Sequence, residues 1–113
     1  MKVTFYIDDK GGVRFPTASS DLACKKGDCI QLIAGEVVQG RVYKELVALA
    51  AAGDDFEWWG EYLRIFCSSG RVRVLHPGCE DDEYAEMSLL QLRMFLRDWK
   101  VFLEKGERVD ANY

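Results

Sequence analysis

The sequence has no basic tail, no basic helix and no long apolar run, and each absence removes a class of protein. Its formal net charge of −4 disfavours nucleic-acid binding, because such binding depends on Lys and Arg neutralising phosphates. The apolar run Leu46–Ala52 is far short of the about 20 residues that a membrane-spanning helix needs. Val3–Ile7 stops at Asp8, too early for a signal peptide. We therefore expect a cytoplasmic protein that contacts neither nucleic acid nor membrane.

The sequence also has little that indicates catalysis. It contains a single histidine, His76, and no nucleophile motif accompanies it. Gly11-Gly12 is not followed by the Lys-Ser/Thr pair of a phosphate-binding loop. Adjacent carboxylates such as Asp54 and Asp55 stand in turn-like segments, where they are usually solvated. We predict no catalytic residue, no metal site and no cofactor.

Cysteine is present, but not in a tight metal-binding spacing. The four cysteines, Cys24, Cys29, Cys67 and Cys79, permit two disulfides with three possible pairings. Neither pair forms the C-x2-C knuckle typical of structural zinc. Buried, reduced thiols are the favoured interpretation. The alternative is a small zinc- or redox-linked enzyme or sensor that uses these cysteines together with His76.

The strand pattern predicts two hairpins. At 113 residues, 49% of them hydrophobic, the chain is expected to form one domain, residues 1–113. Val3–Ile7 and Val13–Phe15 flank a cluster of turn formers and predict an N-terminal hairpin. Alternation predicts a second hairpin, from Glu61–Cys67 and Arg71–His76. Its loop, Ser68-Ser69-Gly70, suits three residues with glycine in the left-handed conformation, and Arg64, Arg71 and Arg73 are expected on its outer face.

The helix pattern completes the expected fold. Apolar residues recur at helical spacing in 41–52 and 89–105. The second helix begins with the capping-box pair Ser88 and Gln91 and ends at Gly106. Cys29–Ile33 is compatible with a strand or a helical turn, a further strand is expected at Glu83–Met87, and 107–113 is expected to be a short tail. The fold class is therefore α+β, an antiparallel sheet of about four or five strands covered by two helices.

The second predicted helix carries more apolar surface than one sheet requires. Leu90, Met94 and Val101 widen its apolar arc beyond a single stripe. We favour contact with a second part of the core, and a dimer or partner contact is the alternative. A monomer or a weak homodimer follows from these two interpretations.

Two short segments without any Lys or Arg hold nine of the 19 acidic residues. They are Asp54–Glu61 and Glu80–Glu86. The second hairpin separates them in the sequence, and its open end is expected to bring them close together. A merged acidic patch would attract a basic partner. Trp58 and Trp59 in the first segment should point to opposite sides of an extended strand; we expect Trp59 to be buried and Trp58 to be exposed.

The last part of the chain resembles a known family. Glu83–Leu92 followed by Phe95–Leu103, a strand, a capped Ser-Leu helix start and a Trp-x-x-Phe-Leu ending, is similar to immunity proteins of bacterial polymorphic-toxin and contact-dependent growth inhibition systems. The resemblance implies a non-enzymatic protein that binds a cognate, basic toxin domain, frequently a nuclease. Acidic residues would mimic nucleic-acid phosphates in the toxin site. The predicted partner-binding residues are Asp54, Asp55, Glu57, Trp58, Glu61, Glu80, Asp81, Asp82 and Glu83.

Overall fold

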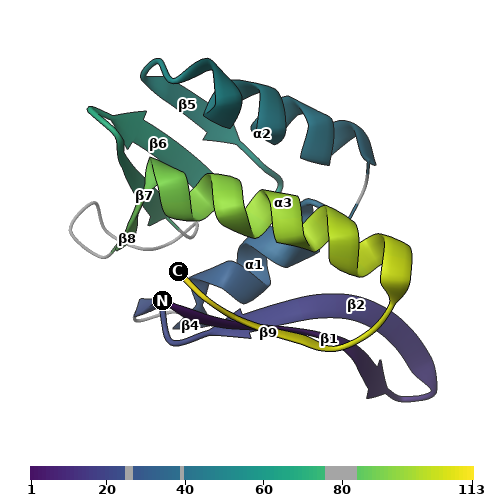
Figure 1. Cartoon of the computed structure of the whole chain (residues 1–113). Coiled ribbons are helices and arrows are strands. Elements are labelled where there is room, and N and C mark those ends of the chain that lie inside the picture. The colour runs from purple at the N-terminus through teal and green to yellow at the C-terminus, as the bar shows by residue number, and fades with distance from the viewer. Residues whose placement is uncertain (25–26, 39, 76–83) are drawn as a thin grey trace.

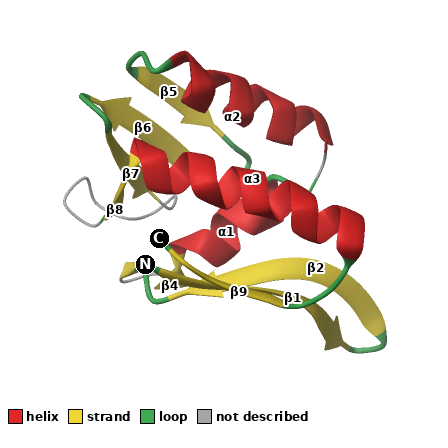
Figure 2. Cartoon of the chain, viewed as in Figure 1, coloured by secondary structure: helices red, strands yellow, loops and turns green. Residues whose placement is uncertain are grey.

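The computed structural model describes residues 1–24, 27–38, 40–75 and 84–113, and the side chains of 23–27 are not described (Figure 1). Strands and helices both occur along the whole chain (Figure 2). The elements in chain order are β1 (Lys2–Lys10), β2 (Val13–Ser20), β3 (Ala23–Cys24), β4 (Gly27–Asp28), α1 (Cys29–Glu36), α2 (Gly40–Ala52), β5 (Phe56–Trp59), β6 (Arg64–Ser68), β7 (Arg71–Leu75), β8 (Ala85–Ser88), α3 (Leu89–Lys105) and β9 (Val109–Asn112).

The α+β class, the antiparallel pairing and both predicted helices are confirmed, but the strands divide into separate sheets. One sheet has the order β2-β1-β9 and another the order β5-β6-β7-β8. A two-stranded ribbon, β3-β4, precedes α1. The predicted N-terminal hairpin is confirmed and is longer than expected, with Val3 opposite Ser20 and Lys10 opposite Val13.

Residues 107–113 do not form a tail, and this prediction is wrong. β9 pairs antiparallel with β1, with Asn112 opposite Lys2 and Val109 opposite Phe5. Beyond the strand, the Met1 ammonium group donates to the carbonyl oxygen of Tyr113 at 2.7 Å. The pairing joins residues more than a hundred positions apart, so no local pattern in the sequence indicates it.

The second predicted hairpin is confirmed as β6-β7, with a tighter loop than expected. Ser68 still pairs with Arg71, which leaves Ser69 and Gly70 as the loop. Both have positive φ, 52° and 76°, as a two-residue hairpin turn of the primed type requires. The prediction of a three-residue loop is wrong because the strand continues through Ser68.

Helix ends follow the local signals in the sequence. Ser88 Oγ accepts from the Gln91 amide at 3.0 Å while Gln91 Oε1 accepts from the Ser88 amide at 2.9 Å, the predicted capping box. Gly106 ends α3 in the left-handed conformation at φ 68°. The region around Cys29 is helical, because Asp28 Oδ1 caps the amides of Ile30 and Gln31.

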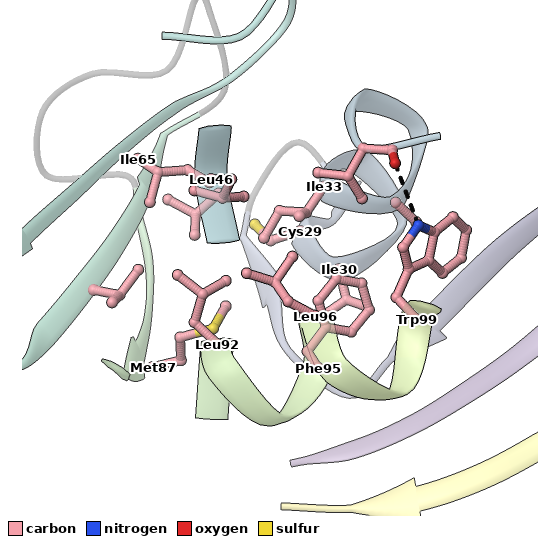
Figure 3. Packing of buried hydrophobic residues seen from close by; sticks show 14 of the residues in the cluster. Cys29, Ile30, Ile33, Leu46, Ile65, Met87, Leu92, Phe95, Leu96 and Trp99 are labelled. Atoms are coloured by element: carbon pink, nitrogen blue, oxygen red, sulfur yellow. Dashed lines mark hydrogen bonds between the residues drawn. The ribbon is translucent and has the colours of Figure 1, made fainter. Parts of the chain in front are cut away.

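The core lies on both sides of α3, which crosses the molecule between the two larger sheets (Figure 1). Toward β1, the ring of Phe5 stacks on Phe95 with centroids 5.6 Å apart. Figure 3 shows Leu92 beside Met87 of β8 on the other side, and Leu46 of α2 beside Ile65 of β6. The Trp99 indole donates to the carbonyl of Val37 at 3.3 Å (Figure 3), which satisfies its only polar atom inside the core.

The additional apolar residues of α3 do not all reach the core. Leu90 is 62% exposed and Val101 is 40% exposed, so the favoured interpretation is wrong for both. Met94 is half-buried. The helix packs on two sheets and on α2, and its remaining arc faces outward.

Candidate protein-binding surface

The four-stranded sheet turns one face to the helices and leaves the other exposed. Buried and more exposed residues alternate along β6 and β7, and the buried set belongs to the core. Figure 2 shows the helices on the inner side of this sheet. We call the opposite side the outer sheet face. By strand register it holds Glu57, Trp59, Arg64, Phe66, Arg71, Arg73 and Glu86, and Tyr84 joins it through its contact with Arg73.

Arginine side chains stack on aromatic rings across this face. The Arg64 guanidinium carbon lies 4.6 Å from the ring centroid of Trp59 and 5.2 Å from that of Phe66. The Arg73 guanidinium carbon lies 5.0 Å from the ring centroid of Tyr84. Such contacts each contribute about 0.5–1 kcal/mol at exposed sites. They orient large side chains on the surface. The register of β6 against β7 confirms that Arg64, Arg71 and Arg73 belong to one face.

Carboxylates on the outer sheet face are paired within the chain. Glu57 Oε1 accepts from the Trp59 indole at 2.5 Å, and Glu86 Oε1 accepts from the Arg71 Nε at 2.6 Å. A shallow depression of about 820 Å³ lies over the middle of the face, lined by Asp55, Glu57 and the arginines. The surface is therefore mixed in charge and rich in aromatics, with its acidic side along β5.

Trp58 and Trp59 divide between core and surface as expected, but in the opposite sense. Trp58 is 6% exposed and Trp59 is 62% exposed. Trp58 pairs with Ile65, which faces the core, and Trp59 pairs with Arg64, which faces outward. The prediction that Trp59 is buried is wrong, and Trp58 is inaccessible as a binding residue. Pairing β5 against the apolar positions of β6 would have indicated the correct side.

The first acidic segment runs along the whole edge strand instead of gathering at one end. Asp54, Asp55, Glu57 and Glu61 are all exposed. Asp55 Oδ1 accepts from the Ser69 amide at 2.9 Å, at the closed end of the β6-β7 hairpin. Glu61 lies at the open end, next to the Gly60–Leu63 backbone bond.

The second predicted acidic cluster, Glu80, Asp81, Asp82 and Glu83, lies outside the described residues. The expected merger of the two segments therefore stays a prediction. The described residues on either side of this cluster show at which end of the sheet the chain leaves β7 and enters β8. Leu75 pairs with Arg64, and Ala85 pairs with Val74. The chain thus leaves β7 and enters β8 at the Glu61 end, and Asp54 and Asp55 lie at the other end of the strand.

Glu36 fixes the loop that follows β5. Its carboxylate accepts from the Glu61 amide at 2.9 Å and also from the Tyr62 amide. A Cβ atom on Gly60 would lie 2.5 Å from Glu36 Oε2 and 2.8 Å from Trp58 Cη2. Only glycine leaves room for this approach. The anchored loop holds Tyr62, 60% exposed, at the same small depression as Trp59.

The cysteine residues that the structure describes lie in the core. Cys29 and Cys67 are buried, as predicted, and burial raises the pKa of the Cys67 thiol, which disfavours the reactive thiolate. The Cys24 side chain, His76 and Cys79 lie outside the described residues. Within the described part of the chain, no group of three His, Cys, Asp or Glu side chains is placed to hold a metal ion.

Comparisons with known proteins do not assign this chain to a family. Neither protein-family models, nor curated proteins, nor solved structures match the chain. Within the described residues, none of the helices has both the length and the apolar composition to cross a bilayer. The geometry of the surface is thus what supports a function.

Proposed function

We propose that the chain is a non-enzymatic binding protein of the immunity type, which neutralises a cognate toxin domain through the outer sheet face and the acidic β5 edge. The observation that carries the proposal is Trp59. It is a large, 62% exposed side chain that is held in place by Arg64 and Glu57 and shares a small depression with the exposed Glu61.

Trp59 has the properties of a binding hot spot. Tryptophan is enriched at the centres of protein interfaces, where truncation costs 2 kcal/mol or more. Its ring is stacked and its indole nitrogen is bonded before a partner arrives, so less side-chain entropy is lost on binding. Tyr62 adds a second exposed ring on a loop that Glu36 anchors.

The carboxylates favour a basic partner. Glu57 and Glu61 lie close to Trp59, and Asp54 and Asp55 lie at the other end of the same sheet edge, in a chain with a formal net charge of −4. Such an edge accelerates encounter with a basic surface and repels an acidic one. A nuclease toxin, whose site binds phosphates, fits this chemistry. A cytoplasmic monomer or weak homodimer that needs no cofactor is part of the same proposal.

Co-expression with the product of a neighbouring reading frame tests the proposed function. The expected partner is a short basic toxin domain at the C-terminal end of a large secreted protein. We expect this chain to co-purify with the toxin domain and to restore growth of cells that express it. A toxin domain that remains fully active in the presence of excess chain, with no complex on a sizing column, would overturn the proposal.

Charge-reversal variants of this chain test whether the acidic edge contacts the toxin domain. Replacing Asp54 and Asp55 with Lys should slow association and reduce its dependence on salt, because both effects come from surface charge. Asp81→Lys with Asp82→Lys is expected to act in the same direction. Unchanged association rates and an unchanged salt dependence in both variants would remove the carboxylates from the interface.

A further inference from the structure

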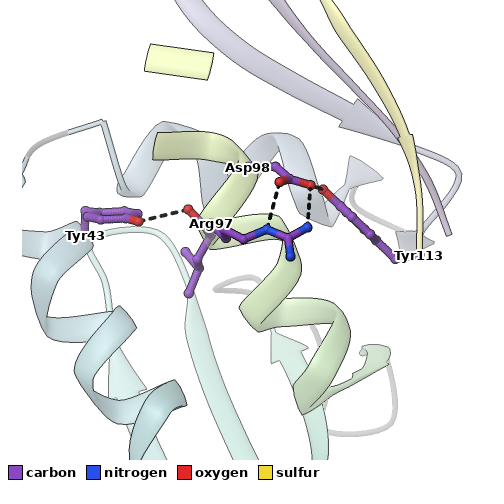
Figure 4. Close-up of polar contacts among 5 residues, drawn as sticks. Tyr43, Arg97, Asp98 and Tyr113 are labelled. Atoms are coloured by element: carbon purple, nitrogen blue, oxygen red, sulfur yellow. Dashed lines mark hydrogen bonds and ion pairs between the residues drawn. The ribbon is translucent and has the colours of Figure 1, made fainter. Parts of the chain in front are cut away.

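A second surface lies on the opposite side of the molecule from the outer sheet face, between α2 and α3. The two helices run antiparallel: the Tyr43 hydroxyl donates to the Leu96 carbonyl at 2.9 Å (Figure 4), and the Arg93 Nε donates to the Ala50 carbonyl at 2.6 Å. A groove of about 670 Å³ follows the helix pair. A second depression of about 420 Å³ continues it toward Val38.

The floor of this groove is apolar although it faces outward. Val47 and Val101 lie on it, and Leu103 and Val38 extend it at one end. Val101 and Leu103 are each 40% exposed, and Val38 is 44% exposed. The two depressions share Tyr43, Val47 and Lys100, so the apolar strip is continuous. Contiguous exposed apolar surface with a polar border is typical of an interaction site.

The border of the groove is cationic in a chain that is acidic overall. Lys44, Arg93, Arg97 and Lys100 line it, and Glu104 is the one acidic residue among the described residues that line it. Asp98 holds Arg97 by an ion pair with 3.1 Å between Nε and Oδ1 (Figure 4). Lys44 and Lys100 are exposed on opposite helices. An occupant with carboxylates along both of its borders would complement these charges.

The walls of the groove determine the shape of the occupant. In the part of the chain that the structure describes, the lining of the larger depression comes from α2 and α3, so it is a channel between two helices with an open outer side. A small ligand is usually enclosed over most of its surface, which two walls do not provide. A third helix, in contrast, packs its ridge into the groove between two others.

We propose that the α2–α3 groove binds an amphipathic helix with an apolar stripe and acidic borders, supplied by a partner protein. This surface is separate from the outer sheet face and leaves that face accessible. The binding protein would then hold two partners, or two parts of one partner, at the same time.

Designed peptides test the proposal without knowledge of the natural partner. The probe is a helical peptide of about 18 residues, longer than the length at which isolated helices become marginal, with leucine at helical spacing and glutamate on both borders. A matched peptide carries lysine in place of glutamate. We expect binding of the acidic peptide, measured by fluorescence anisotropy, and binding of the lysine peptide weaker by at least about tenfold.

Variants of the groove locate the binding site. Lys44→Glu with Lys100→Glu should weaken the acidic peptide about tenfold, and Val101→Asp should abolish its binding. Lys105→Glu changes the same charge on α3 outside the groove and should bind like the wild-type chain. Circular dichroism confirms that each variant is folded. Four results would overturn the proposal. They are equal binding of both peptides, no binding of either peptide, binding of palmitate (a small apolar ligand) without binding of the acidic peptide, or a loss of binding in Lys105→Glu equal to that in the groove variants.

Discussion

Trp58 and Trp59 are neighbours in the chain, yet they face opposite environments. The alternation of an extended strand made the division predictable from sequence. Which tryptophan is buried depends on the register of β5 against β6, where Trp58 pairs with Ile65 and Trp59 with Arg64. Register is a tertiary property that the four residues of β5 do not encode alone, and this is why the sequence-based assignment was wrong.

The two tryptophans should respond differently to truncation. Trp58→Ala removes a side chain that is 6% exposed and should lower the free energy of unfolding by about 3–5 kcal/mol. Trp59→Ala loses mainly the contact with Arg64 and should cost about 1 kcal/mol or less. Urea unfolding followed by circular dichroism measures both. Equal losses would contradict the assigned environments.

Gly60 is a second position where a single added atom, the Cβ of any other residue, should affect stability. A Cβ atom there would meet the rigid Trp58 ring at 2.8 Å and the Glu36 carboxylate at 2.5 Å. Glu36 is not free to move away without losing its bonds to the loop amides. Gly60→Ala should therefore destabilise the fold by about 1–3 kcal/mol.

Gly35→Ala is the matched control for Gly60→Ala. Gly35 lies in α1, and a Cβ atom on it would meet nothing within 4 Å. Alanine is the better helix former, so this variant should gain up to about 1 kcal/mol. Thermal unfolding of the two variants compares them directly. A loss in both variants, or in neither, would contradict the close approach at Gly60.

At the scale of elements, the helices were predictable because their signals are local. Ser88, Gln91 and Gly106 mark the ends of α3 within its own sequence, and the structure confirms each of them. α1 was ambiguous because its apolar run is short, and only Asp28 as its cap indicates a helix. β9 was missed because its partner, β1, lies at the other end of the chain.

Removing β9 should show that it is part of the fold. Deletion of 109–113 exposes the edge of β1 and removes the pairing from Lys2 to Phe5. We expect a loss of about 3 kcal/mol from several backbone hydrogen bonds and a fall of about 10 °C in the unfolding temperature, measured by calorimetry.

The control for this deletion keeps the strand and removes the contacts of one exposed side chain, which also pairs loosely with Arg108 at 3.9 Å. Asp110→Ala eliminates the bond that the Thr4 hydroxyl donates to Asp110 at 2.8 Å, on an exposed edge. It should cost about 1 kcal/mol or less. If the deletion costs no more than this substitution, residues 109–113 behave as a tail after all.

At the scale of the whole molecule, polar contacts tie the end of the chain to α3. The Gln91 side-chain amide donates to the Tyr113 carbonyl at 3.1 Å. The Tyr113 hydroxyl donates to Asp98 Oδ2, and Asp98 also pairs with Arg97 (Figure 4). Burial raises the pKa of Tyr113 above its usual value of 10.0, and the bond to Asp98 adds to that shift. The neutral phenol is thus favoured in the folded state.

This shift gives stability a dependence on alkaline pH. Below pH 10 the phenol is protonated in both states, and its contribution is fully present. Above the unfolded pKa of 10.0 the unfolded chain binds fewer protons than the folded chain, so stability falls as pH rises. Tyr113→Phe should show a smaller fall between pH 9 and 11 in urea titrations. An identical fall in both proteins would contradict the contact.

At this scale the net charge was predictable from the sequence, but the positions of the charged side chains on the surface were predictable only in part. The composition shows the acidic excess, and the alternation of β6 and β7 places their arginines on one face. That β5 distributes Asp54 to Glu61 along an edge, beside those arginines, follows from sheet order and register. Whether Glu80–Glu83 extend this edge stays a prediction.

The affinity of the chain for the proposed toxin domain, measured with Trp59→Ala beside Leu90→Ala, tests the central claim most directly. Both residues are 62% exposed, but only Trp59 lies on the outer sheet face. We expect Trp59→Ala to weaken binding at least about thirtyfold, as the loss of a hot spot implies, and Leu90→Ala to bind like the wild-type chain. Unchanged affinity for Trp59→Ala, or a larger loss for Leu90→Ala, would contradict the proposed binding face.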